Sequence, residues 1–371
     1  MLKKYFESVS DVRVEGRIKH NLLETIVLTI CAVVSGCDCW WQIGDFCAVK
    51  EQWFRDRMGL KLKNGVPSHD TFQRIFSLLN PKEFEKCFIK WVKAVCRVDR
   101  EIVNIDGKTI AASRTGDEPP LHLVNAWANK SKLVLGQEAT DSKSNEITAI
   151  PNLLETLDLK GCIITIDAMG TQKEIAKKIA GNNDYVLALK GNHTKMHKDV
   201  YTYFEETLAD EELYFEQNRL KTEEKSHGRE EKRAYYLSTD IDWLEGKKDW
   251  EGLKAIGAVW TETVRGGKVC FQHRYYLTSL TSVEEFAESV RDHWGIENSL
   301  HWCLDVTFNE DNCTTRACNT AQNFALIRKI ALNILTPYQP PNKKEKLSIK
   351  AKRRKCEYDC EFMATVLLSA I

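Results

Sequence analysis

The spacing of apolar residues changes near residue 99, from a helical period to a strand-like one. Before that point they recur every three or four positions, as at Leu23, Val27 and Ile30, which predicts amphipathic helices. We therefore expect an all-α N-terminal domain over 1–98, which serves either to bind DNA or as a scaffold for the next domain. The predicted helices cover 22–34, 40–57, 71–79 and 83–98.

Beyond residue 99, short β-branched and apolar runs predict strands in the order β-β-β-α-β-α-β. The strands cover 101–106, 121–128, 132–139, 162–167 and 184–189, and the helices cover 145–157 and 171–179. This order, with an aspartate on the first and fourth strands, is that of the ribonuclease-H-like fold. There the two strands are parallel neighbours at the sheet centre. We expect an α/β core with a mixed five-stranded sheet and flanking helices, formed by 99–192 plus 285–335.

The remaining segments differ in composition. Residues 193–284 begin with a charge-rich stretch and continue with strand-like alternation over 255–263 and 270–280, which predicts a β-rich insertion. Helical patterns return over 283–302, 320–335 and 357–371. The final segment, 336–371, contains a basic run at 343–355 with eight Lys or Arg, which is either a solvated face or a non-specific DNA contact.

Carboxylates stand at the ends of two apolar strands, at Asp106 and Asp167. A buried carboxylate costs desolvation unless a cation meets it, and ligands of open α/β sheets bind at this edge. A pair of Mg²⁺ ions would need a third acid, for which Glu297 is the best candidate. On a regular helix, His293 and His301 share the face of Glu297.

Composition excludes little. Lys plus Arg equal Asp plus Glu at 53 each, so overall charge does not decide whether the partner is a nucleic acid. The start of the chain lacks a signal-peptide core, and none of the close cysteine pairs has zinc-site spacing, so we expect reduced thiols in a cytoplasmic protein. The longest apolar run, 26–36, is short of the roughly 20 residues that span a bilayer, so no membrane association is expected.

Seven segments in order along the chain resemble the DDE transposases of bacterial insertion sequences, specifically the H-repeat-associated, ISAs-type group. They cover nearly the whole chain, which makes the set specific even though each segment alone is a weak signal. The segments are Asn64–Phe72, Ile105–Thr109, Lys143–Ile147, Thr165–Gly170, Leu189–Asn192, His227–Arg229 and His293–Asn298.

The resemblance implies that Asp106, Asp167 and Glu297 form the catalytic triad and hold two Mg²⁺ ions, for which Mn²⁺ can substitute. It implies nicking at transposon ends and attack of the freed 3′-OH on target DNA. The expected partners are therefore terminal inverted repeats and target DNA. Pairing of two ends implies a homodimer on DNA, in a bacterial cytoplasm and at the nucleoid.

Related transposases carry a Tyr, an Arg and a Lys at set distances from the glutamate, where this chain has Val290, His293 and Leu304. We expect Arg291, His293 and His301 to replace their phosphate contacts. Further expected DNA contacts, with a solvated side chain as the alternative for each, are Lys108, Lys190, Asn192, His227 and Arg229.

Two other functions remain open from the sequence. One is a ribonuclease-H-like nuclease without strand transfer. The other is a domesticated or decayed transposase that binds DNA without catalysis. The complete acid triad argues against the second, and the helical N-terminal domain, the insertion and the basic segment argue against a minimal nuclease.

Overall fold

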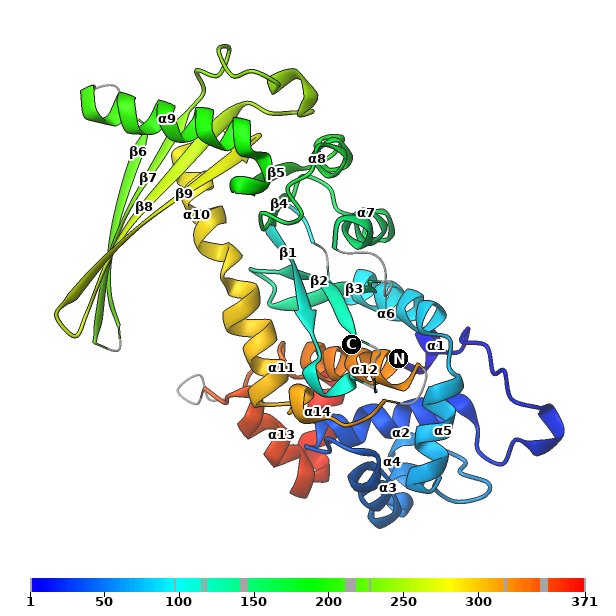
Figure 1. Cartoon of the computed structure of the whole chain (residues 1–371). Helices are drawn as coiled ribbons and strands as arrows, with labels where there is room; N and C mark the ends of the chain where they lie inside the picture. The colour runs from blue at the N-terminus through cyan, green and yellow to red at the C-terminus, as the bar shows by residue number, and fades with distance from the viewer. Residues whose placement is uncertain are drawn as a thin grey trace.

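A helical body and an extended sheet make up the molecule, and both chain ends lie at the helical body (Figure 1). None of the described helices is both long and apolar enough to cross a membrane. The computed structural model describes residues 2–96, 98–114, 116, 119–140, 146–210, 218–226, 228–316, 319–340 and 346–369.

The N-terminal part is helical, as its apolar repeat predicts, and polar caps start three of its helices. The side chains of Asn21, Ser68 and Asn80 accept backbone N–H groups in the first turns of α2, α5 and α6. The single helix predicted over 40–57 is wrong, because Lys50 leaves helical geometry (φ −102°, ψ 14°) and separates α3 from α4. The helices are α1 (Leu2–Phe6), α2 (Leu22–Val34), α3 (Trp40–Val49), α4 (Glu51–Met58), α5 (His69–Leu78) and α6 (Pro81–Val95).

One mixed sheet of nine strands runs through the rest, in the order β3-β2-β1-β4-β5-β9-β8-β7-β6. The predicted parallel pairing of the first and fourth strands is confirmed, with Ile105 opposite Ile166. The strands are β1 (Ile102–Thr109), β2 (His122–Ala128), β3 (Leu133–Ala139), β4 (Ile163–Ile166), β5 (Asp184–Leu189), β6 (Arg219–Ser226), β7 (Arg229–Ser238), β8 (Ala255–Arg265) and β9 (Lys268–Thr278).

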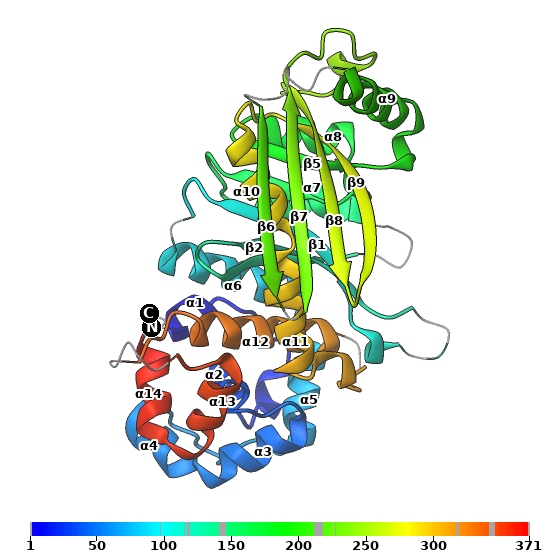
Figure 2. The same cartoon turned by 90° about the vertical axis from the view of Figure 1, so that its left-hand side faces the viewer.

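The expected limit of five strands is wrong, because the β-rich segment continues the sheet. β9 pairs antiparallel with β5, and β8, β7 and β6 follow outward. A five-stranded sheet would leave the N–H and C=O groups along one side of β5 unpaired, whereas β9 satisfies them. The added strands form the long blade seen in Figure 2.

Helices cover the two faces of the sheet. α7 (Glu146–Thr156) and α8 (Lys173–Ala180) lie on one face, and α10 (Val283–His293) crosses the other, from β6 and β7 to β1 (Figure 1). At the outer edge, the Asn333 amide of α12 (Thr320–Leu335) bonds both backbone polar groups of Val134 in β3. This side chain therefore pairs edge backbone groups of β3 that a further strand would otherwise pair.

Short elements complete the chain around these layers. The 17-residue helix α9 (Thr194–Asp210) follows β5 and packs on β9. A π-helix and a short α-helix extend α10. The remaining short elements are η1 (Glu15–Arg17), η2 (Ala111–Ser113), η3 (Gly191–His193), η4 (Lys247–Asp249), the π-helix η5 (Ile296–His301), α11 (Trp302–Val306) and η6 (Glu310–Asn312).

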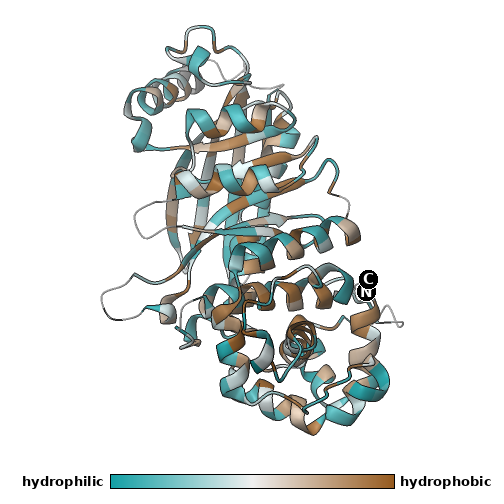
Figure 3. Ribbon diagram, turned by 90° about the vertical axis from the view of Figure 1, so that its right-hand side faces the viewer, coloured by the Kyte–Doolittle hydropathy of each residue, from teal (hydrophilic) through white to brown (hydrophobic). Residues whose placement is uncertain are grey.

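The C-terminal segment folds back onto the N-terminal helices as α13 (Ile349–Tyr358) and α14 (Cys360–Ser369), instead of the single predicted helix over 357–371. Part of its basic run is buried. Lys352 donates to the carbonyls of Leu335 and Tyr338, and Arg353 pairs with Asp38 at 2.7 Å. These two cations stabilise the helical body and are not a free DNA-binding face. Hydrophobic positions accordingly concentrate inside this body in Figure 3.

Candidate active site

A cavity of about 550 Å³ opens at the ends of β4 and β5, beside the middle of β1, and the three predicted acids line it. Asp106 belongs to β1, Asp167 directly follows β4, and Glu297 belongs to the π-helix after α10. The parallel pairing of β1 with β4 brings the two aspartates to one edge, although 61 residues separate them in the chain.

Asp106 is the most perturbed of these acids. Burial raises its pKa to about 7, and the negative charges of Asp167, Glu146 and Glu297 add to this effect. His301 Nδ1 lies 3.8 Å from its Oδ2, but burial lowers the pKa of His301 to about 3, so this imidazole is neutral at pH 7. A phosphate contact of His301 would therefore involve a neutral ring, and this contact stays a prediction.

Asp167 is held by its own loop. Its Oδ1 accepts the N–H groups of Met169 at 3.0 Å and of Gly170 at 3.2 Å. Burial raises its pKa, and these two hydrogen bonds counteract the rise. Asn192 donates its amide to the Ala168 carbonyl at 2.7 Å and so braces the aspartate loop, while its predicted DNA contact stays a prediction.

Glu297 lies on a π-helix, not on the regular helix that the sequence predicted. Gly295, directly before the π-helix, is closely packed. A Cβ there would lie 2.4 Å from Asn129 Oδ1 and 3.6 Å from Asn104 Nδ2. The backbone thus passes directly over the sheet, and the π-turn, a feature often found at functional sites, follows at once. The Glu297 side chain is exposed to the cavity.

His293 joins the helix to the sheet. Its Nδ1 lies 2.9 Å from Thr165 Oγ1, and that hydroxyl donates to Asn104 Oδ1 at 2.9 Å. Burial, followed by the charges of Arg274 and Lys190, lowers the pKa of His293 to about 4. A neutral ring with this partner positions α10, and the expected phosphate contact of His293 stays a prediction.

Lys108 also has a different role from the predicted one. Its side chain is 8% exposed, and its ammonium lies 2.7 Å from Asp305 and 3.2 Å from Asp311. The two aspartates hold its charge inside the protein, which excludes it as a free phosphate contact. The ion pairs fasten β1 to the segment after the π-helix.

Two of the remaining predicted contacts, Arg291 and Arg229, lie against or on the blade. Arg291 of α10 pairs with Glu224 of β6, and Arg229 pairs with Glu231 at 2.5 Å. Both guanidinium groups remain partly exposed. His227 lies outside the described residues, so its predicted role stays a prediction.

Three further side chains of the cavity bear on its chemistry. Lys190 is exposed, and its charge acts on Asp167 and His293. Arg274 of β9 lies over the Trp294 ring at 4.8 Å. Sequence reasoning missed Arg274, because nothing local distinguishes it from other cations of a charged strand. It reaches the cavity only because β9 pairs with β5.

The three carboxylates are chemically suited to bind a divalent metal ion. Carboxylate oxygens are the ligands that Mg²⁺ prefers, and the described residues put no charged cation beside Asp106. As the side chains stand, no three described His, Cys, Asp or Glu residues are close enough together to hold one ion. Binding would therefore require side-chain rotation.

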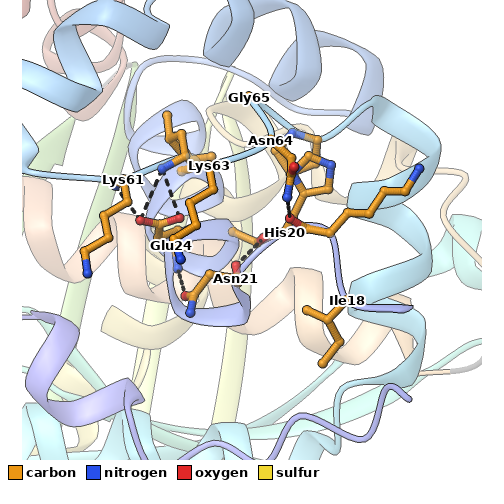
Figure 4. Close-up of a pocket in the computed structure, with 13 residues that line it drawn as sticks. Ile18, His20, Asn21, Glu24, Lys61, Lys63, Asn64 and Gly65 are labelled. Carbon is orange, nitrogen blue, oxygen red and sulfur yellow. Dashed lines mark hydrogen bonds between the residues drawn. The ribbon is translucent and has the colours of Figure 1, made fainter. Parts of the chain in front are cut away.

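A second hollow of about 340 Å³ lies in the helical body, between the start of α2 and the loop after α4 (Figure 4). Glu24 accepts the N–H of Lys61 at 2.6 Å, and Asn64 donates to the Lys19 carbonyl. These bonds tie down the loop that carries the Asn64–Phe72 segment. The segment therefore has a structural role in the helical body, apart from the cavity that the predicted acids line.

Comparisons with known proteins agree along the whole chain. The family model "Transposase DDE domain" matches residues 97–334, and "DDE_Tnp_1-associated" matches 3–92. The "H repeat-associated putative transposase YhhI" of Escherichia coli K12 is 39% identical, over 99% of this chain and 98% of its own. The "Putative transposase YncI" of Escherichia coli O157:H7 is 38% identical, over 99% and 94%.

A solved synaptic complex of piggyBac transposase with hairpin DNA aligns with 98% of this chain and 78% of that chain. Its TM-score of 0.44 and 13% identity are too low to carry a conclusion. The family model and the full-length relatives are sufficient without it. The chain belongs to the DDE transposase family.

Proposed function

We propose that the chain is an insertion-sequence transposase that cleaves DNA at the ends of its element and joins the freed 3′ ends to target DNA. The observation that carries this proposal is the meeting of Asp106, Asp167 and Glu297 in one cavity. They come from three elements far apart in the chain. The strand order β3-β2-β1-β4-β5 supports a ribonuclease-H-like core around them.

In this proposal, the three carboxylates hold two Mg²⁺ ions, which supply Lewis acidity toward the scissile phosphate and an activated water or 3′-OH. Asp106 is deprotonated on binding, and the raised pKa indicates how strongly its charge requires a counter-charge. The Met169 and Gly170 N–H groups fix the orientation of Asp167.

We assign phosphate recognition to two cationic residues that line the cavity, Lys190 and Arg274. Lys190 is exposed beside Asp167, and the planar guanidinium of Arg274 is presented on Trp294. Arginine suits bidentate phosphate contact. We propose Arg274 in place of the arginine that related transposases carry near the glutamate, since His293 is neutral and occupied by Thr165.

The test is cleavage and strand transfer on DNA with the inverted repeats that flank the gene, in Mg²⁺ or Mn²⁺. Asp106→Ala, Asp167→Ala and Glu297→Ala should each abolish both steps, and Asp240→Ala, at an exposed loop residue, should not. Full activity in the three cavity variants would refute the site. Cleavage without joined products would favour a nuclease, and DNA binding without cleavage would favour a decayed transposase.

The size of the protein–DNA complex tests the proposed homodimer. A complex of two chains with two end fragments is expected on light scattering. A one-to-one complex that still joins ends would contradict the dimer but not the chemistry.

A further inference from the structure

The strand β9 has one edge that is free over most of its length. On one side it pairs with β8 from Lys268 to Thr278, but on the other side β5 pairs only with Tyr275–Thr278. Among the described strands, none pairs with 268–274 on that second side. An open strand edge is a place where proteins bind partners unless the edge is covered or blocked.

This free edge begins at the cavity that the predicted acids line. Gln272 and Arg274 line the cavity from one face of β9, and His273 and Tyr275 line it from the other. Successive side chains of a strand point to opposite faces, so the cavity is bordered here by the edge of the strand. From Arg274 back to Lys268, the edge runs away from the cavity to the hairpin that joins β8 and β9 at the tip of the blade (Figure 2).

β9 also differs in charge from the other strands of the blade. Its eleven residues, Lys268–Thr278, include two cations and no acid, whereas β6, β7 and β8 each carry at least one glutamate. Two acids do lie near it. Glu205 Oε1 of α9 is 3.2 Å from His273 Nδ1, and Glu262 stands opposite Phe271 on β8, one strand farther from the free edge. The edge itself therefore suits the negative charge of a nucleic-acid backbone.

A large aromatic side chain stands in water on this strand. Phe271 is 69% exposed, and Val269, two positions away on the same face, is 53% exposed. Helix α9 packs on this face nearer to β5, where the His197 and Tyr201 rings contact Tyr275. Neighbouring apolar side chains that a fold leaves exposed mark interaction sites. Beside a cationic edge, an aromatic ring is a stacking surface for a nucleic-acid base.

We propose that the free part of β9, 268–274, binds single-stranded DNA that leaves the cavity, with Phe271 stacked on a base and Lys268 and Arg274 near phosphates. The proposal rests on the proposed function, because cleavage beside the three carboxylates is what frees a strand end there. It deepens that function by naming the surface on which the freed strand lies. It does not require cleavage to be measured, since DNA binding can be followed in chelator.

Fluorescence anisotropy in chelator tests it, with a blunt duplex that carries the inverted repeat and with the same duplex extended by a single strand of about six nucleotides. The wild type should bind the extended DNA more tightly than the blunt one. Phe271→Ala should lower affinity for the extended DNA by about fivefold or more and leave affinity for the blunt duplex unchanged, and Phe271→Trp should keep the preference. Because Phe271 is exposed, its truncation should leave the fold intact. The control Tyr358→Ala, also 69% exposed but on α13 of the helical body, should bind both DNAs like the wild type.

A preference of wild-type size in Phe271→Ala would overturn the proposal, and so would a wild type that binds both DNAs equally. If Phe271→Ala keeps the preference but turns a dimer into a monomer on light scattering, the edge binds a second copy of the chain, and the proposal is equally overturned.

Cleavage of the same DNA by the wild type in Mg²⁺ tests the proposed function separately. Cleavage without any preference for the extended DNA excludes only the β9 surface. A preference that Phe271→Ala loses, in a protein that does not cleave, would count against the proposed function and leave the β9 surface standing.

Discussion

Replacing Asp106 by Asn should stabilise the metal-free protein above neutral pH and remove its response to Mg²⁺. Asn keeps the shape and can still accept a hydrogen bond from the Gly107 N–H. It removes a largely buried charge that is repelled by the charges of Asp167, Glu146 and Glu297. A residue that serves only the fold would give the opposite result, because most core substitutions destabilise.

The magnitude follows from the pKa of Asp106, which rises from 3.8 to about 7. One pKa unit corresponds to about 1.4 kcal/mol, so keeping this carboxyl ionised at pH 8 costs the fold about 4 kcal/mol, or about 2–4 kcal/mol with salt screening. Unfolding a chain of 371 residues has an entropy of about 0.8 kcal/mol per degree. The melting temperature should therefore rise by about 3–5 °C.

The pH dependence has a definite sign. A raised folded pKa gives a stabilising contribution that is complete below the unfolded pKa, near 4, and is lost as pH rises through about 7. Wild type and Asp106→Asn should melt together near pH 4 and diverge toward pH 8. Saturating Mg²⁺ should close the gap, because a ligand present at 100 times its Kd stabilises by about 2.7 kcal/mol.

The assay is thermal melting in chelator from pH 4 to 8, repeated with Mg²⁺, with Asp240→Asn as an exposed control. The control should stay within about 1 °C of the wild type at each pH. An Asp106→Asn protein that melts at or below the wild type at pH 8 without metal would refute the electrostatic reasoning. So would a Mg²⁺ response of wild-type size in that variant.

Three further substitutions test other parts of the site. Gly295→Ala should cost about 1–3 kcal/mol by overpacking against Asn129 and should also reduce cleavage, because the π-helix that carries the glutamate must shift. Lys108→Met should destabilise the fold by about 1–3 kcal/mol and lower the melting temperature, because it leaves two half-exposed aspartates unpaired. The salt dependence of DNA binding should not change. A lower slope of log affinity against log salt would support the predicted phosphate contact of Lys108. Arg274→Ala should weaken DNA binding and lower the slope of log affinity against log salt by about one, whereas Arg274→Lys should keep the slope.

Local pattern predicted much of the core. The five strands and their order followed from short apolar runs, and strand-end positions indicated that Asp106 and Asp167 meet. The extent of the sheet did not follow, because pairing of β9 with β5 is a contact over 80 residues with no local signature. A β-rich segment has the same alternation whether it forms its own sheet or extends another.

The charge states of the site residues were harder to predict from the sequence than their positions. His293, His301 and Lys108 are polar residues near the predicted acids, and the sequence offered no way to see that all three are mostly shielded from solvent. Burial neutralises the imidazoles and pairs the lysine, because an isolated buried cation is too costly. Arg274 reaches the cavity through the pairing of β9 with β5, which spacing alone does not encode.

The sequence by itself determined most of the helices and the five strands of the core, and it predicted that Asp106, Asp167 and Glu297 belong to one site. Tertiary structure decided which polar groups stay charged and which carboxylates share one cavity. The physical reason is that periodicity and capping act within a few residues, whereas desolvation and charge repulsion depend on everything packed around a group. Asp106 is predicted from its strand, and its raised pKa comes from three carboxylates and a burial that only the fold assembles.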